Sequence, residues 1–240
     1  MLLCSMDKQG AFAHPAHGDY PRSWSVPPTD YGKNGCDNVT STPSEGYITH
    51  RGSCTWCNGD LHSGGRLRNN SYYADGAITD DGIRRLKLAM NQSLPWFVAV
   101  GYRDPHLPWR YPAKYGDLYP VGIPFTNHSQ PPTDTPPMAW QWPLYFNGNY
   151  GSFWNLTDLT HSTLTTSEVA EGTRAYYATI SYTDAEIGRL LGALRAGGQY
   201  NQTLVVLWSD HGQNVGEHAT WCKMSVWEHS LRVALMIKPP

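Results

Sequence analysis

Three short apolar runs rich in β-branched residues stand out along the chain. They lie at residues 96–101, 204–208 and 231–237, and each is bounded by polar or turn-forming residues. A short, mostly apolar run of this kind, interrupted only by Arg232 in the last of the three, is typical of a buried strand. We therefore predict a strand at each of the three places.

Two other segments have the apolar spacing of amphipathic helices. Residues 80–90 alternate apolar and basic positions, and residues 167–196 form the longest helical pattern, which ends at Gly197 and Gly198. The apolar positions are Ile83, Leu86, Leu88 and Met90 in the first helix, and Tyr176, Ile180, Ile187, Leu191 and Leu194 in the second.

The remaining stretches favour irregular structure. Residues 1–76 are rich in Gly, Pro, Asn and Ser and are predicted to be mostly loop, and residues 103–145 hold ten prolines. Strands separated by helices predict an α/β fold in which a mainly parallel sheet is flanked by helices.

The composition is that of an ordinary globular protein. The chain has 240 residues, of which 40% are apolar and 16% charged, with a formal net charge of −2. Because no basic stretch is interleaved with aromatic residues, nucleic acid is not an expected partner. No apolar run has the length of a membrane span, and the apolar residues 1–6 are too few for a signal peptide.

Motifs for asparagine-linked glycosylation are frequent. Chance gives about two Asn-X-Ser/Thr motifs in such a chain, but six occur, at Asn38, Asn69, Asn91, Asn127, Asn155 and Asn201. The excess predicts passage through the secretory pathway, and hence a lysosomal or secreted location. Since no signal peptide is visible, we expect the N-terminus of the protein to lie upstream of residue 1.

Three of the five cysteines lie close together. In an oxidising compartment, Cys36 is expected to form a disulfide with Cys54 or Cys57. The Cys-X-X-Cys spacing leaves two alternatives open, a zinc site with His50 and His62 and a redox motif, although no βα pattern surrounds it.

Asp210 and His211 follow the predicted strand at 204–208 after a single serine. In open α/β sheets, ligands bind just beyond the carboxyl ends of the strands. An Asp-His pair at that place can hold a metal ion, and Lys223, a dozen residues later, can reach an anion beside it. The alternative is a strand that ends in a polar turn, with Asp210 capping the residues that follow.

A histidine also follows the predicted strand at 96–101. His106 lies between Pro105 and Pro108, which stiffen the loop that presents it. For this residue alone, a surface loop histidine is the alternative. Two strands of one sheet that both deliver histidines at their carboxyl ends together predict a shared active site.

The segments around these residues resemble the sulfatase family, in particular its iduronate-2-sulfatase-like enzymes. The matching segments are Gly-Tyr-Arg-Asp-Pro-His-Leu-Pro-Trp-Arg-Tyr-Pro at 101–112, the long helix at 176–191, Ser-Asp-His-Gly at 209–212, Gly-Glu-His at 216–218 with Lys223, and upstream His14-Pro15 and 24–28. The order is the same and the spacing nearly so, from about residue 14 to the end of the chain.

The resemblance implies an alkaline-phosphatase-like α/β sandwich that hydrolyses sulfate esters. In this family a formylglycine, made from the cysteine of a Cys-X-Pro/Ala-X-Arg motif, is the nucleophile beside a bound calcium. Carried over, Asp210 and His211 would be metal ligands and Lys223 would contact the sulfate. His106 would face the bridging oxygen of the leaving group, and His14 would hydrogen-bond the hydrated aldehyde.

The chain departs from the family pattern at several positions. None of its cysteines is followed by the required Pro/Ala and Arg, and the Asp-Asp pair that opens the calcium site is absent, so a Ca²⁺ site is expected to be incomplete. Ala11 stands where a sulfate-binding lysine is usual, with Lys8 nearby. Gln213 replaces a tryptophan of the sugar pocket, and Arg103-Asp104 replace His-Lys.

We therefore predict that residues 1–240 are an internal part of a sulfatase catalytic domain, without the nucleophile segment and the C-terminal subdomain. The expected function is sulfuric ester hydrolysis on a sulfated carbohydrate, with the chain alone inactive. Two alternatives stay open. One is a phosphodiesterase or phosphonate hydrolase of the same superfamily with a Ser or Thr nucleophile, and the other is a secreted sulfatase-like glycoprotein without catalysis.

Overall fold

The computed structural model describes most of the second half of the chain and parts of the first. The described residues are 2–6, 29–30, 47–50, 53–57, 73–106, 109–123, 133–136, 166–223 and 225–240. The strands are β1 (Leu2–Met6), β2 (Thr29–Asp30), β3 (Tyr47–His50), β4 (Ser53–Cys57), β5 (Phe97–Val100), β6 (Trp109–Arg110), β7 (Val205–Trp208), β8 (Asn214–Val215), β9 (Trp221–Cys222) and β10 (Leu235–Lys238). The helices are α2 (Ala74–Met90), α3 (Ala113–Gly116), α6 (Thr166–Ala196) and α7 (Glu228–Leu231), with the short 3-10 helices η5 (Tyr200–Gln202) and η6 (Glu217–Ala219).

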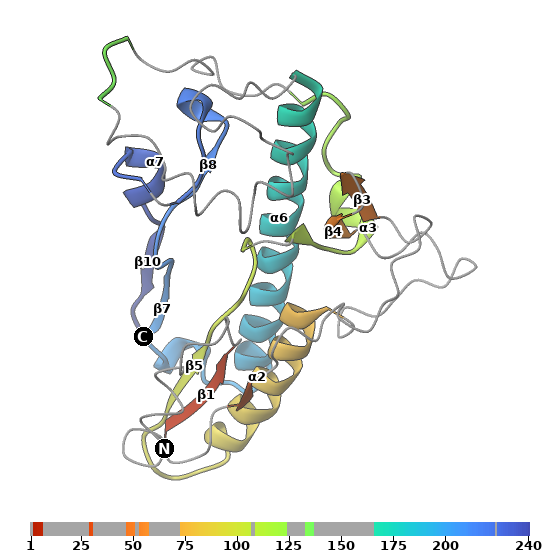
Figure 1. Cartoon of the computed structure of the whole chain (residues 1–240). Coiled ribbons are helices and arrows are strands. Elements are labelled where there is room, and N and C mark those ends of the chain that lie inside the picture. The colour runs from red at the N-terminus through yellow and green to blue at the C-terminus, as the bar shows by residue number, and fades with distance from the viewer. Residues whose placement is uncertain are drawn as a thin grey trace, which may run out of the picture.

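Helix α6 is the longest of the described elements. It contacts α2, α3, β6 and β8 (Figure 1). The helix predicted from residues 167–196 is thus confirmed, with its start one residue earlier. Gly198 follows its end with a φ of +71°, a conformation that glycine adopts at little cost. Within the described residues, no helix is both long and apolar enough to span a bilayer.

Helix α2 starts six residues before the predicted start at residue 80 and ends at Met90 as expected. Its buried face contains Ile78, Leu86 and Ala89, which recur at the helical period. Leu88, one of the predicted apolar positions, is 50% exposed. Residues two positions apart lie on nearly opposite sides of a helix, so Leu88 faces away from the side that buries Leu86.

A close approach joins α2 to its neighbours. A Cβ atom at Gly82 would lie 3.1 Å from Val100 Cγ2 of β5 and 3.5 Å from Leu190 Cδ1 of α6. Glycine at this position lets the helix sit against both elements. It therefore fixes α2 beside the end of β5, where the first candidate site residues begin.

A parallel sheet in the order β2-β1-β5 confirms the predicted α/β architecture, and α2 packs against it. β1 pairs with β5 from Leu2 opposite Phe97 to Ser5 opposite Val100. The interpretation of residues 1–76 as mostly loop missed four short strands, β1 to β4. Their polar, glycine-rich surroundings gave no periodic signal, and their pairing depends on partners elsewhere in the chain.

The strand predicted at 204–208 is present as β7, but its environment differs from the expectation. It pairs antiparallel with β10, with Trp208 opposite Leu235, and among the described strands these two form a separate ribbon. Its side chains are half-buried to exposed rather than buried, and Trp208 is 63% exposed. The strand predicted at 231–237 begins only at Leu235, because α7 extends to Leu231.

Candidate active site

Asp210 and His211 lie in the turn directly after β7. The His211 backbone N–H donates to Asp210 Oδ1 at 3.0 Å, and His211 Nδ1 lies 2.8 Å from the Gly212 carbonyl oxygen. Because a carbonyl only accepts, this contact assigns a proton to Nδ1. His211 Nε2 then lies 3.6 Å from Asp210 Oδ2, and the Asp210 side chain is 83% exposed. The pair presents a carboxylate and a ring nitrogen side by side.

Gly212 holds this turn against α7. Its N–H donates to the carbonyl oxygen of Ser230 at 2.8 Å. A Cβ atom at Gly212 would lie 2.1 Å from the His229 carbonyl oxygen and 2.7 Å from that of Arg232. No side chain fits in that space, so the glycine of the Asp-His-Gly segment is a steric requirement of the turn.

A hairpin brings the other two residues of this region together. Strands β8 and β9 pair antiparallel, with Asn214 opposite Cys222 and Val215 opposite Trp221. Gln213 precedes β8 and Lys223 follows β9, so the same register places them at the open end of the hairpin. Both are half-buried. Residues ten positions apart in the sequence are thereby neighbours next to the Asp210–His211 turn.

The Gly-Glu-His segment at 216–218 forms the closed end of this hairpin. Gly216 has a φ of +106°, and Glu217 Oε2 accepts a 2.6 Å hydrogen bond from the Val215 N–H. The His218 ring packs on the indole of Trp227, with centroids 4.6 Å apart. In this structure these residues shape the turn, and their side chains contact the protein itself.

Asn214 was not singled out from the sequence, although it anchors the hairpin. Its side chain is fully buried, and Nδ2 donates to Ser230 Oγ at 2.5 Å and to Ser225 Oγ at 3.2 Å. The two serine hydroxyls lie 2.6 Å apart. β8 has only two residues, Asn214 and Val215, so the sequence contains no strand pattern that could have pointed to Asn214.

His106 ends the turn that follows β5. Its backbone N–H donates to the carbonyl oxygen of Arg103 at 2.9 Å, and the Trp109 indole donates to the carbonyl oxygen of Pro105 at 2.9 Å. Trp109 is completely buried, and its ring packs edge-on against Tyr176 of α6. The loop that presents the half-buried His106 is thus tied to the core through its backbone.

Asp75, in the first turn of α2, is the residue that sequence reasoning missed on this side. It is 1% exposed. Oδ1 accepts the N–H of Arg103 at 2.8 Å, and Oδ2 accepts the N–H of Asp104 at 3.1 Å and the Thr183 hydroxyl at 3.3 Å. The sequence carries no local sign of these contacts, because the partners lie 28, 29 and 108 residues away.

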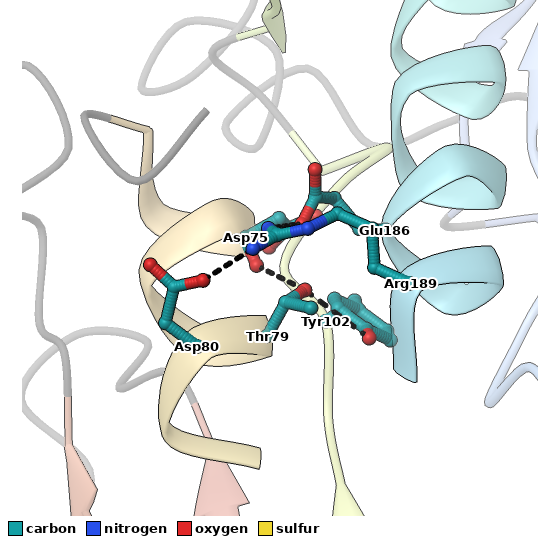
Figure 2. A network of polar contacts seen from close by, with 6 residues as sticks. All are labelled: Asp75, Thr79, Asp80, Tyr102, Glu186 and Arg189. Atoms are coloured by element: carbon teal, nitrogen blue, oxygen red, sulfur yellow. Dashed lines mark hydrogen bonds and ion pairs between the residues drawn. The ribbon is translucent and has the colours of Figure 1, made fainter. Parts of the chain in front are cut away.

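A second set of polar contacts surrounds Asp75 (Figure 2). The Thr79 hydroxyl donates to the Asp75 carbonyl oxygen and lies 3.3 Å from Tyr102 Oη. Arg189 of α6 bridges Asp80 and the fully buried Glu186, with both contacts at 2.5 Å. The Arg189–Asp80 contact thus joins α6 to α2, and the Thr79–Tyr102 contact joins α2 to the segment that follows β5.

The environment keeps the Tyr102 phenol protonated. Burial raises the pKa of Tyr102 well above its usual value, the hydrogen bond with Thr79 lowers it in part, and the negative charge of Asp75 adds to the rise. A neutral phenol at this position acts as a hydrogen-bonding and packing group rather than as an acid or base near neutral pH.

The two histidine-bearing turns lie on different sheets. His106 follows β5 in the β2-β1-β5 sheet, whereas Asp210 follows β7 in the β7–β10 ribbon. The expectation that one sheet delivers both is wrong for the described strands, because β7 pairs with β10 and not with β5. Convergence of His106 with Asp210 and Lys223 in one pocket stays a prediction.

Several predicted residues lie outside the described part of the chain. These are His14, Cys36 and the glycosylation motifs at Asn38, Asn69, Asn127 and Asn155. Cys54 and Cys57 lie in β4, where they pair with Thr49 and Tyr47 of β3, and the disulfide with Cys36 stays a prediction.

Two glycosylation motifs lie on described surface. Asn91 directly follows α2 and Asn201 lies in η5, and both residues are exposed. The ends of these elements are joined by Gln199, whose amide nitrogen donates to the Met90 carbonyl oxygen and whose amide oxygen accepts the Trp96 indole N–H. Both acceptor asparagines are therefore accessible on the same end of the molecule.

The described residues do not fit a complete calcium site. Calcium takes six to eight oxygen ligands, and Asp210 offers one carboxylate. Among the residues whose positions are described, no three His, Cys, Asp or Glu side chains are grouped so as to hold a metal. Asp210 and His211 stay predicted ligands.

Comparisons with known proteins place these residues in a family. The sulfatase family model matches residues 9–240. Iduronate 2-sulfatase of Mus musculus is 29% identical over 225 residues, which cover 92% of this chain and 39% of that protein. Choline-sulfatase of Rhizobium meliloti is 32% identical over 178 residues, which cover 72% of this chain and 30% of that protein.

The fold is also found among solved structures. The phosphonate monoester hydrolase of Silicibacter pomeroyi superposes with a TM-score of 0.63 at 19% identity, over all of this chain and 50% of that one. This likeness confirms the alkaline-phosphatase-like architecture. The chain spans about two fifths of the length of the iduronate 2-sulfatase it matches. Because the family model covers all but its first eight residues, the chain belongs to the sulfatase family.

Proposed function

We propose that the full-length protein hydrolyses a sulfate ester of a carbohydrate. The observation that carries the proposal is the family match over residues 9–240, which contains the Asp210–His211 turn and the hairpin bearing Lys223. The two sulfatases named above act on esters whose alcohols differ, so sulfate is the part of the substrate that they share. The match to iduronate 2-sulfatase over 92% of the chain favours a carbohydrate as the alcohol.

Lys223 is proposed to hold the sulfate group. A lysine ammonium is a compact positive charge with three N–H donors, which suits an anion with several equivalent oxygens. Because Gln213 lies across the hairpin from Lys223, a sulfate at the ammonium leaves the sugar near the Gln213 amide. The amide can donate to and accept from sugar hydroxyls.

His106 is proposed to face the oxygen that leaves. When the sulfur–oxygen bond breaks, negative charge develops on the sugar oxygen, and a proton from an imidazolium offsets it. The backbone contacts at Arg103 and Pro105 support this role, because a proton donor must keep its position relative to the substrate.

A lysosomal or secreted location is proposed as well. It rests on the six Asn-X-Ser/Thr motifs, on the exposure of Asn91 and Asn201, and on the similarity to iduronate 2-sulfatase. Expression in mammalian cells followed by enzymatic deglycosylation should lower the apparent mass, and should do so less in the Asn91→Gln and Asn201→Gln variants.

The function is tested with matched substrates. The purified full-length protein is assayed with a sulfated sugar, a phosphate diester and a phosphonate monoester that share one leaving group where possible. Preference for the sulfate ester supports the proposal, whereas preference for either phosphorus ester supports a phosphonate hydrolase or phosphodiesterase. No turnover of any of them supports the non-catalytic glycoprotein. The 240-residue chain has no Cys-X-Pro/Ala-X-Arg motif, so we expect no sulfatase turnover from that chain alone. Turnover would contradict the proposal that these residues bind the substrate while the nucleophile comes from a segment that they do not include.

A further inference from the structure

A buried carboxylate on α2 controls the backbone of the loop that ends at His106. Asp75 is 1% exposed, and its two oxygens accept the consecutive N–H groups of Arg103 and Asp104 at 2.8 and 3.1 Å. Two adjacent peptide N–H groups that point at one carboxylate fix both peptide planes at once. Hydrogen bonds to an ionised acceptor are stronger than those between neutral groups.

The contact reaches His106 through one further hydrogen bond. The N–H of His106 donates to the carbonyl oxygen of Arg103 at 2.9 Å, and the N–H of Arg103 is the one that Asp75 Oδ1 accepts. The two bonds lie on the same residue, so a shift of the Arg103 backbone displaces the turn that carries the imidazole.

Asp75 is itself held from two helices. The Thr183 hydroxyl of α6 donates to Oδ2 at 3.3 Å. The Thr79 hydroxyl of α2 donates to the Asp75 carbonyl oxygen at 2.8 Å (Figure 2). The first turn of α2 also favours a negative charge, because the helix dipole is positive there. The carboxylate is thus a rigid point to which the loop is attached.

A carboxylate is required at this position for a specific reason. An amide of the same shape offers one acceptor oxygen, and its NH2 group would face either the Arg103 or the Asp104 N–H. Two donors would then oppose each other in a buried place, and one loop N–H would lose its acceptor.

We propose that Asp75 is a positioning residue of the active site, which holds the Arg103–His106 loop so that the imidazole meets the leaving oxygen of the sulfate ester. This inference rests on the function proposed above. In this role Asp75 acts on the substrate through His106 and not by contact with it.

The variant that tests the inference is Asp75→Asn, with Asp81→Asn as its matched control. Asp81 is also buried, at 6% exposure, and lies on the same helix, but it pairs with Arg84 and, at 2.6 Å, with Arg85. Both variants lose a buried carboxylate of α2. Only the first loses the acceptor of the loop backbone.

Leaving-group dependence separates positioning from general damage. In the full-length enzyme, Asp75→Asn should lower kcat on a sugar sulfate by about 10- to 100-fold with little change in KM. On 4-nitrophenyl sulfate the loss should be several times smaller, since a good leaving group needs less help from a proton donor. Asp81→Asn should change both substrates by the same factor, as expected when only the amount of folded enzyme changes.

A double variant tests the route through His106. In a His106→Ala background, Asp75→Asn should have no further effect on the sugar sulfate, because the residue that it positions is gone. Full additivity of the two losses, or an equal loss on both substrates from Asp75→Asn alone, would overturn the inference.

The proposed function and the positioning role fail differently. If the parent enzyme hydrolyses no sulfate ester, the proposed function is contradicted. The position of the ring is then read by NMR, from the His106 Cε1–Hε1 signal assigned by its absence in His106→Ala. A shift of that signal in Asp75→Asn but not in Asp81→Asn supports the positioning of His106, and an unchanged signal overturns it.

Discussion

The Asn214 side chain donates a 2.5 Å hydrogen bond to the hydroxyl of Ser230, and this bond joins the β8–β9 hairpin to α7. Ser230 also accepts the Gly212 N–H at its carbonyl oxygen. One serine of α7 therefore fixes both the turn that carries Asp210 and the hairpin that carries Lys223. The relative placement of these two predicted site residues depends on contacts that neither of them makes.

Replacing Ser230 by alanine should destabilise this region. The completely buried Asn214 amide would lose its 2.5 Å hydrogen bond to the Ser230 hydroxyl. We expect the free energy of unfolding to fall by about 1–3 kcal/mol, the range for a buried polar group that loses a partner. Urea unfolding of Ser230→Ala, with the exposed Ser167→Ala as control, measures this, and equal stability of the two variants would contradict it.

Substituting Gly212 by alanine should displace the Asp210 turn. The new methyl group would lie 2.1 Å from the His229 carbonyl oxygen, so backbone must move. We expect a loss of about 1–3 kcal/mol, as for other overpacked sites. Gly192→Ala is the control, because its Cβ meets nothing within 4 Å on an exposed face of α6, and a gain of up to about 1 kcal/mol is expected there. A Gly212→Ala protein as stable as the parent would show that the turn can relax freely.

The helices and the strands that precede the site residues could be predicted from the sequence because their signals are local. The apolar period of residues 167–196 and the glycines at its end correctly located α6, and the apolar run at 204–208 correctly located β7. In each case the signal is a pattern among residues that are close together in the chain, so a single sequence contains it.

The residues that hold the site could not be found in this way. Asp75 and Asn214 act on segments 28 and 16 residues away. Acidic residues are common in the first turn of a helix because they interact favourably with the helix dipole. The presence of Asp75 there therefore does not indicate a distant partner. The sheet to which β7 belongs was likewise mispredicted. A sequence pattern can show that a segment is a strand and which of its side chains share a face. The strand with which that segment pairs depends on the packing of the whole chain.

Tyr176 should make stability fall at alkaline pH. Burial, followed by the negative charge of Glu217, raises the pKa of Tyr176 from 10.0 to about 12. Below about pH 10 both the folded and the unfolded chain keep the phenolic proton. Between pH 10 and 12 only the unfolded chain releases it, so the free energy of unfolding decreases by up to about 1.4 kcal/mol per pH unit.

The contribution of this one phenol is isolated by Tyr176→Phe. The phenyl ring can still pack against Trp109, and the titrating group is gone. Denaturant unfolding of parent and variant from about pH 9 to about pH 11 should show a smaller alkaline decrease in the variant. Parallel curves across that range would mean that Tyr176 releases its proton equally readily in both states.

Lys223→Ala should weaken the full-length enzyme on every sulfate ester. The proposed contact is with the sulfate, which all substrates share and whose charge is redistributed in the transition state. Loss of one preorganised electrostatic contact raises the barrier by about 2–4 kcal/mol. Steady-state kinetics on a sugar sulfate and on an aryl sulfate should show similar losses, and a variant that spares either substrate would contradict the role.

Gln213→Trp should instead separate the two kinds of substrate. Gln213 lies at the same end of the hairpin as Lys223, but it is proposed to face the sugar. An indole in place of the amide exchanges hydrogen bonds for a stacking surface, so the ranking of sugar sulfates by kcat/KM should change. A small aryl sulfate lacks the sugar and should be affected little. The test is a paired assay of the variant on both substrates. A loss on the aryl sulfate as large as that on the sugar sulfate would place Gln213 at the sulfate, and would contradict the proposal that Lys223 binds the sulfate while Gln213 binds the sugar.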